Sequence, residues 1–249
     1  MSDFNYAILE QRTHRPWPIP DAPWVMTQTW HDLLFAHWRV EPGALRAIVP
    51  PVFPIDTFDG QAWVGVVPFR MTNVGPRLAP SLPGVSAFPE LNVRTYVRVD
   101  NMPGVYFFSL DAGSAAAVAA ARSLLRLPYY TAQMTVEIDA SIEYRSRRNW
   151  GPPATFRARY APTGAPSAPK QGSLEYFLTE RYCLYATDHF RRPYRLEILH
   201  PPWPLQSAQA DIAENTMTQW VGIDLSGPPL LHFSRRQDVV CWGPKVIRR

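Results

Sequence analysis

The segment Leu91–Asp100 alternates strictly between apolar and polar residues, and this alternation constrains the fold more than any other feature of the sequence. One face carries Leu91, Val93, Thr95, Val97 and Val99, and the other carries Asn92, Arg94, Tyr96, Arg98 and Asp100. A period of two predicts a β-strand with one apolar face and one polar face. Turn-forming residues at 101–104 and an apolar run at 105–110 then predict a hairpin.

The polar face of this strand allows two interpretations. Two arginines beside Tyr96 suit a carboxylate or another anion as ligand. The alternative is an ordinary solvent-facing strand with charged side chains. We expect solvent exposure for Arg98 and Asp100, which lie next to the turn, whereas both interpretations stay open for Arg94 at mid-strand.

A helix follows the hairpin. Alanine and leucine dominate Ser114–Leu125, with Asp111 or Ser114 as the capping residue and Pro128 ending the segment. Tyr129 and Tyr130 come next. Strict alternation over 134–145 then predicts one further strand.

The rest of the chain predicts many strands and few helices. We expect an N-terminal arm at 1–24 that packs on the body, although partner recognition by this arm stays open. We also expect a strand at Val25–Val40, a helix at Glu41–Pro51, a hairpin turn at Asp59–Gly60 and a candidate lid at Asn73–Phe88. Ser173 is the expected cap of a short helical turn, and Asp238–Trp242 the last strand. The fold class is therefore α+β and mostly β, with an antiparallel or mixed sheet curved into a barrel in one domain, residues 1–249.

Composition excludes several classes of protein. The apolar fraction of 46% fits a globular core, and no run reaches the ~18 apolar residues of a membrane span. We expect no secretory leader. We expect Cys183 and Cys241 to be buried, reduced thiols, and we expect a cytoplasmic location. The net charge of +4 comes without a basic stripe, so we expect no nucleic-acid partner.

Motifs for cofactors and metals are also missing from the sequence. It contains no glycine-rich phosphate loop, no dinucleotide fingerprint and no G-x-S-x-G nucleophile motif. The histidines are scattered without metal-ligand spacing. We therefore expect no cofactor and no metal, and each histidine is expected to be structural or exposed.

Several stretches resemble the YqjF-like family, which is grouped with the acetoacetate decarboxylase-like superfamily. They are ALRAIVPPVFPID at 44–56, QAWVGVVPFRM at 61–71, FPELNVRTYV at 88–97, PGVYFFSLD at 103–111, LPYYTAQM at 127–134 and FLTERYCLY at 177–185. The resemblance implies a cone- or barrel-like sheet around an internal pocket. It also implies a Pro-Lys-Lys run whose lysine forms a Schiff base. This chain has Tyr129 and Tyr130 after Pro128, and its only lysines are Lys170 and Lys245, so Schiff-base chemistry is not expected.

Two functions follow as hypotheses. The first is an enzyme that holds a small organic acid, either a keto, hydroxy or aromatic acid, with Arg94 as the carboxylate anchor and Tyr96 lining the pocket. Proton donors and acceptors would come from Tyr129, Tyr130, Glu90, Glu180 and Asp111. Arg181 is expected either to bind ligand or, preferentially, to pair with Glu180. The second is a non-catalytic small-ligand binder, with aromatic residues such as Tyr96, Tyr106, Phe107 and Tyr144 lining an apolar pocket. A homo-oligomer stays open, and an interaction protein using the arm is a weaker third hypothesis.

Overall fold

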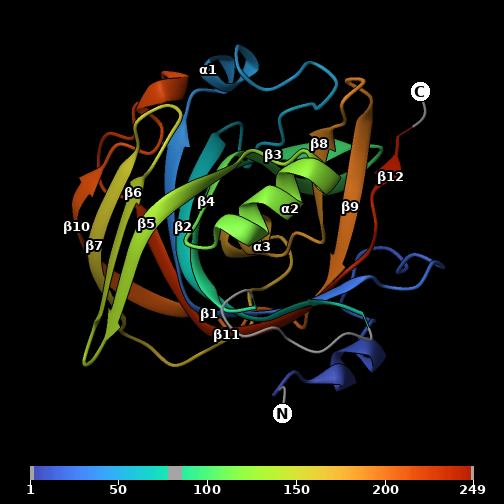
Figure 1. Cartoon of the computed structure of the whole chain (residues 1–249), viewed down its shortest axis with the longest axis horizontal. Coiled ribbons are helices and arrows are strands. Elements are labelled where there is room, and N and C mark those ends of the chain that lie inside the picture. Colours follow the sequence, from blue (N-terminus) through green and yellow to red (C-terminus); the bar gives the residue numbers. More distant parts are fainter. Residues whose placement is uncertain (1–2, 78–85, 248–249) are drawn as a thin grey trace.

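The computed structural model describes residues 3–77 and 86–247, and within them the chain is mostly β (Figure 1). Its elements, in chain order, are η1 Tyr6–Glu10, β1 Met26–Val40, α1 Pro42–Arg46, β2 Ala62–Pro76, β3 Phe88–Val99, β4 Met102–Ala112, α2 Ala115–Leu125, β5 Tyr129–Ile138, β6 Ile142–Arg148, β7 Thr155–Pro162, α3 Leu174–Thr179, β8 Cys183–Thr187, β9 Pro193–Leu199, β10 Gln206–Asn215, η2 Gln219–Val221, β11 Leu230–Cys241 and β12 Lys245–Val246.

The described strands form one curved sheet that closes on itself twice. Its order is β12-β9-β8-β4-β3-β2-β1-β11-β10-β7-β6-β5. Parallel pairing of β4 with β5 closes a nine-stranded barrel, and pairing of β9 with β11 closes a second ring through β8. The strands β11-β1-β2-β3-β4 therefore form a wall that both rings share. The predicted mixed, mostly antiparallel barrel with few helices is confirmed.

The two faces of the shared wall have different functions in the fold. Odd-numbered residues of β3 and the even-numbered residues 34–40 of β1 point into the nine-stranded barrel, where Leu34, Val66 and Val93 pack with Tyr144 and Phe156. Burial of this cluster supplies the main hydrophobic stabilisation. The opposite face, which carries the polar side of β3, is covered by α3 and residues 200–205.

Several predicted local structures are confirmed. Ser114 caps α2 by accepting the Ala117 amide hydrogen at 3.3 Å, so Ser114 rather than Asp111 is the cap. Ser173 caps α3 in the same way through Tyr176. Asp59 and Gly60 both have positive φ, as the predicted hairpin turn requires. In the N-terminal arm, Phe4 and Ile8 pack against β9 and β11.

Three predictions about the strands need correction. The alternation over 134–145 belongs to two strands, because β5 ends at Ile138 and β6 starts at Ile142. The three-residue connection preserves the period of two, so the sequence pattern does not reveal it. The final long strand starts at Leu230, well before Asp238. Residues 73–76 of the candidate lid belong to β2, and residues 78–85 lie outside the described residues.

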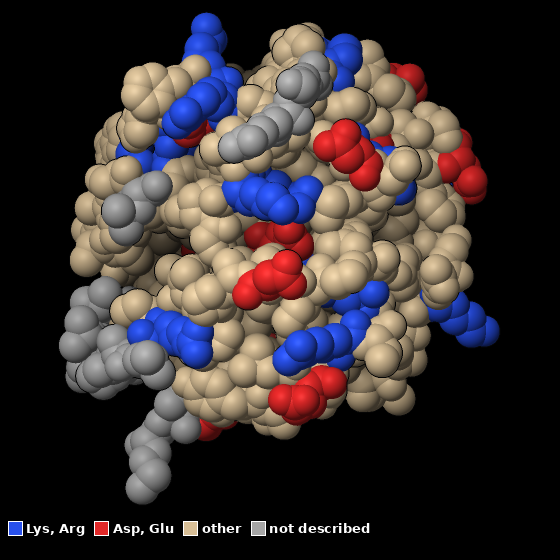
Figure 2. Space-filling view, turned by 90° about the vertical axis from the view of Figure 1, so that its right-hand side faces the viewer, with Lys and Arg blue, Asp and Glu red and all other residues tan. Residues whose placement is uncertain are grey.

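None of the helices in the described ranges is long and apolar enough to cross a membrane. Both cysteines are buried and free, as expected. On the face shown in Figure 2, lysine and arginine side chains alternate with acidic side chains.

Candidate functional site

Most unpaired polar groups of the structure lie on the covered face of the shared wall. Ten buried side-chain atoms of the described residues have no hydrogen-bond partner. Seven of them line this face, and they belong to His37, Trp63, Asn92, Arg94, Trp203, His232 and Ser234. Leaving a buried polar atom unpaired costs about 1–3 kcal/mol, so such a concentration indicates a place where a ligand or ordered water belongs.

Arg94 is the only cation of that set. Its Nη2 donates to the Leu178 carbonyl at 3.2 Å, whereas its buried Nε has no partner. Within the described part of the chain, no carboxylate lies at ion-pair distance from its guanidinium. Phe35 and Tyr96 lie 5.5 and 5.8 Å from the guanidinium carbon. An unpaired guanidinium between aromatic rings is suited to bind an anion.

His37 and Tyr96 adjoin Arg94 because of strand register. His37 of β1 pairs with Gly65 of β2, which pairs with Arg94 of β3. Nε2 of His37 lies 2.6 Å from the Tyr96 hydroxyl, which donates to the Leu178 carbonyl at 2.9 Å. Burial lowers the pKa of His37 well below its usual value, and the positive charge of Arg94 adds to the effect. His37 is therefore neutral at physiological pH.

Gly65 makes this arrangement geometrically feasible. A Cβ at position 65 would lie 3.0 Å from both Cδ2 and Nε2 of His37 and 3.6 Å from Cγ of Arg94. A glycine inside a strand often marks such a close approach.

We predict that Gly65→Ala lowers the free energy of unfolding by about 1–3 kcal/mol, because the imidazole must move against a packed core. Urea denaturation measures this change. Gly75→Ala in the same strand is the matched control, because a Cβ there meets no atom within 4 Å. Equal stability of the two variants would contradict the prediction.

Glu90 and Tyr129 meet at the other end of the same face. The Tyr129 hydroxyl donates to Oε2 of Glu90 at 3.0 Å, and the Glu90 residue is only 3% exposed. Burial raises the pKa of Glu90 to about 8, with a further contribution from the negative charge of Asp111. Burial and Glu90 also raise the pKa of Tyr129. The pair therefore holds two protons at neutral pH and can act as a proton donor.

Tyr130 and Asp111, two other predicted site residues, do not lie on this face. Tyr130 is adjacent to Tyr129 in β5 and points to the opposite side, where the Arg148 guanidinium lies 4.0 Å from its ring. Arg148 also forms a bidentate ion pair with Asp111, at 2.7 and 2.9 Å. Both carboxylate oxygens of Asp111 are bonded by this arginine, and the role of Asp111 as a base stays a prediction.

The expected pairing of Arg181 with Glu180 is wrong. Arg181 binds Asp56 at 2.7 Å. Glu180 accepts hydrogen bonds from the Tyr182 hydroxyl and from the Trp203 amide. The two residues follow the end of α3 at Thr179, and their side chains bind different partners.

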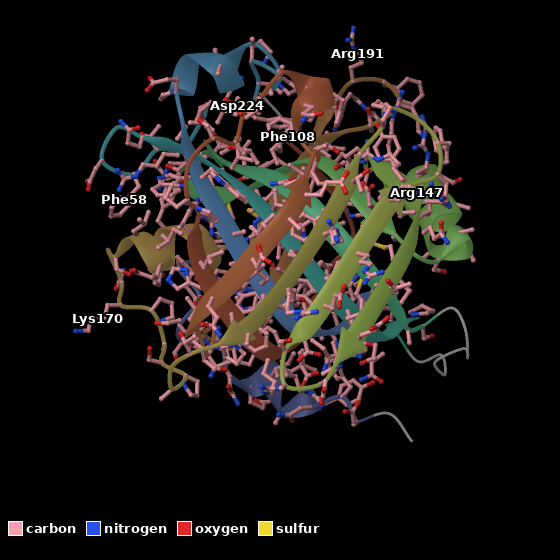
Figure 3. The ribbon with its side chains drawn as sticks, turned by 90° about the vertical axis from the view of Figure 1, so that its left-hand side faces the viewer. Phe58, Phe108, Arg147, Lys170, Arg191 and Asp224 are labelled. Atoms are coloured by element: carbon pink, nitrogen blue, oxygen red, sulfur yellow. The ribbon has the colours of Figure 1, made fainter. Side chains whose placement is uncertain are left out.

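The two lysines and the residues that line one pocket are not among the unpaired groups of this face. Lys170 and Lys245 are both exposed, and Figure 3 shows Lys170 projecting away from the body. One pocket, of about 670 Å³, lies between β10, β11 and residues 215–229 and contains none of the predicted site residues. Its polar side chains include Asn215 and Thr218, whose oxygen atoms already bond Met217 and Ile223. We therefore place the candidate site at the set of unpaired groups and not at this pocket.

A second pocket of about 140 Å³ is lined by Tyr106, Phe107 and Pro128 among others. The other two aromatic residues expected to line a pocket are apart, because Tyr144 of β6 lies inside the nine-stranded barrel and Tyr96 lies on the covered face of the wall. Within the described residues, no group of three or more His, Cys, Asp or Glu side chains is placed to hold a metal ion.

Comparison with known proteins gives a family. The model of DUF2071, described as an uncharacterized conserved protein, matches residues 27–238. The chain belongs to the DUF2071 family. It is 48% identical over 226 residues to the uncharacterized protein YqjF of Bacillus subtilis (strain 168), covering 90% of this chain and 93% of that protein. The resemblance seen in the sequence is confirmed.

Solved structures similar to this DUF2071 chain have an acetoacetate decarboxylase-like fold. Acetoacetate decarboxylase from Legionella pneumophila is 12% identical, with a TM-score of 0.62 over 100% of this chain and 98% of its own. An acetoacetate decarboxylase-like enzyme from Sphingomonas wittichii RW1 is 12% identical, with a TM-score of 0.60 over 94% and 98%. The enduracididine biosynthesis enzyme MppR complexed with pyruvate is 11% identical, with a TM-score of 0.62 over 93% of both chains. At these identities the likeness shows the fold alone.

Four site residues predicted from the sequence lie on one face as two pairs, Glu90 with Tyr129 and Arg94 with Tyr96. His37 was not predicted as a site residue, because each histidine was expected to be structural or exposed. The signal that could have found it is Gly65, a lone glycine inside an apolar strand.

Proposed function

We propose that this protein binds a small organic acid on the covered face of the wall, with Arg94 as the carboxylate anchor. The observation that carries the proposal is the buried Nε of an arginine without a carboxylate partner among the described residues. A carboxylate would accept hydrogen bonds from this guanidinium and offset its cost of burial.

We also propose that Glu90 and Tyr129 act on the bound acid as proton donors. Glu90 and Arg94 are four residue steps apart in the strand, which is about 13 Å between Cα atoms. Asn92 lies between them on the same face, and its Oδ1 is unpaired. A ligand anchored at Arg94 would extend past Asn92 towards the acid pair. Such a reaction proceeds without a Schiff base, because both lysines are exposed.

A non-catalytic ligand-binding protein is the second candidate function. The exposed lysines favour it, since the fold would then keep an anion site without the covalent chemistry. The two functions differ in whether the bound acid is recovered unchanged. Loss of conversion in Tyr129→Phe would support the enzyme, whereas binding without conversion would support the binder.

We predict that small keto, hydroxy or aromatic acids raise the melting temperature of the wild type, and that Arg94→Ala abolishes this effect. A ligand at a hundred times its Kd adds ~2.7 kcal/mol of stability, which thermal-shift measurements detect. Arg157→Ala is the control, because Arg157 is exposed on β7. Acids that stabilise Arg94→Ala as much as the wild type would exclude Arg94 as the anchor.

A further inference from the structure

One edge of the His37 imidazole packs against the wall, and the other edge carries an atom without a hydrogen-bond partner. Its Cδ2 and Nε2 atoms lie against Gly65. The opposite edge carries Nδ1, which has no hydrogen-bond partner although the residue is completely buried. Phe35 stacks beside the ring with an interplanar angle of 7°. The ring is therefore held in place, with one polar atom left free.

The hydrogen bonds around Tyr96 fix the tautomer of His37. The Leu178 carbonyl can only accept, so the Tyr96 hydroxyl uses its single hydrogen there. Nε2 of His37 must then donate to the Tyr96 oxygen. A neutral imidazole with its hydrogen on Nε2 bears a lone pair on Nδ1. The atom left without a partner is consequently a hydrogen-bond acceptor.

The surroundings restrict which donor can meet this acceptor. Arg94 lies on the neighbouring side of Gly65, and its positive charge disfavours an ammonium group at His37. His232 lies on β11 opposite Phe35, and its own buried Nδ1 is also unpaired. A neutral group that donates one hydrogen and can also accept one, such as a hydroxyl, satisfies this environment.

We propose that the acid anchored by Arg94 carries a hydroxyl group, which donates its hydrogen to Nδ1 of His37. The substrate or ligand class is then a small hydroxy acid. This inference rests on the proposed carboxylate site. It adds His37 as a specificity-determining residue that distinguishes a hydroxy acid from the same acid without the hydroxyl group.

Isothermal titration calorimetry with matched acids tests the inference. Lactate is compared with propionate, and 3-hydroxybutyrate with butyrate, so that either position of the hydroxyl is covered; alanine tests the ammonium group. In the wild type we expect at least one hydroxy acid to bind tenfold or more tightly than its partner, and alanine to bind more weakly than lactate. In His37→Phe the ratio of the affinity for the hydroxy acid to the affinity for its partner without the hydroxyl should fall to about one. Propionate and butyrate should keep their affinity.

His31→Phe is the matched control for the substitution. His31 lies in the same strand, but it bonds Thr72 at 2.8 Å, and the ratio should be unchanged in this variant. If His37→Phe does not fold, Tyr96→Phe replaces it. Loss of the Tyr96 hydroxyl releases Nε2 from its fixed role, so the ratio should fall there as well.

The outcomes separate this inference from the proposed function. Equal affinity for hydroxy acids and their partners in the wild type, with all binding lost in Arg94→Ala, would overturn the role of His37 and leave the carboxylate site standing. An affinity ratio that is unchanged in both His37→Phe and Tyr96→Phe would also overturn the role of His37. Absence of binding for every acid would overturn both proposals.

Discussion

Arg148→Ala should lower the free energy of unfolding by about 3–5 kcal/mol, the loss expected when one partner of a buried ion pair is removed. The side chains of Arg148 and Asp111 are both 0% exposed. Arg148 also donates to the Pro152 carbonyl at 3.0 Å and covers the ring of Tyr130. Its removal leaves a carboxylate inside the protein without a counter-charge, at the junction where β4 pairs with β5 to close the barrel.

Chemical denaturation of the wild type and three variants measures this effect. Glu143→Ala is the surface control, because it breaks pairs with the exposed Arg145 and Arg159 and should change stability little. The double variant Asp111→Leu with Arg148→Met should recover most of the loss, because apolar residues of similar size often replace a buried pair without cost. A loss in Arg148→Ala no larger than that in Glu143→Ala would show that the pair does not hold the barrel closed.

Local features of the fold were predictable because they depend on residues close together in the chain. The alternation of β3, the hairpin turn at 59–60 and the Ser114 cap each follow from a few neighbouring residues. The length of β11 was not predictable in this way. Residues 234–237 read Ser-Arg-Arg-Gln, yet Ser234 and Gln237 are buried within this strand. Their burial depends on neighbouring strands that are distant in the sequence.

The pairs within the candidate site depend on such long-range register. Glu90 and Tyr129 are brought together because β4 pairs with β3 on one side and with β5 on the other. Both were predicted from the sequence as site residues, but the sequence did not indicate the hydrogen bond between them. For Arg181 it indicated the wrong partner, because Asp56 lies 125 positions earlier in the chain. Residue types therefore identified candidates, whereas the register decided which of them meet.

Glu90→Gln should remove a large part of the pH dependence of stability. The pKa of Glu90 is about 8 in the folded protein and 4.5 in its ordinary state. Below pH 4.5 both the folded and the unfolded chain hold the proton, so Glu90 contributes no difference. Between pH 4.5 and about 8 only the folded chain keeps the proton, and each pH unit lowers the free energy of unfolding by about 1.4 kcal/mol.

As the pH rises from 4 to 9, the free energy of unfolding of the wild type should thus fall by up to about 5 kcal/mol relative to that of Glu90→Gln. Glutamine has nearly the shape of protonated glutamic acid, and its carbonyl can still accept from the Tyr129 hydroxyl. Urea denaturation of both proteins at each pH measures the difference, and taking the difference cancels the other titrating groups. Glu143→Gln is the control, because Arg145 and Arg159 lower the pKa of Glu143 instead.

The same titration tests whether the Glu90–Tyr129 pair can serve as a proton donor. A protonated Glu90 at neutral pH requires that the stability difference develops above pH 5. If the difference is complete below pH 5, Glu90 is ionised at neutral pH and the acid role assigned to it fails, although Arg94 would still anchor a carboxylate. If the difference develops between pH 5 and 8, an enzyme that uses this proton should lose activity as the pH rises through the same range. A protein that only binds its ligand has no such activity to lose.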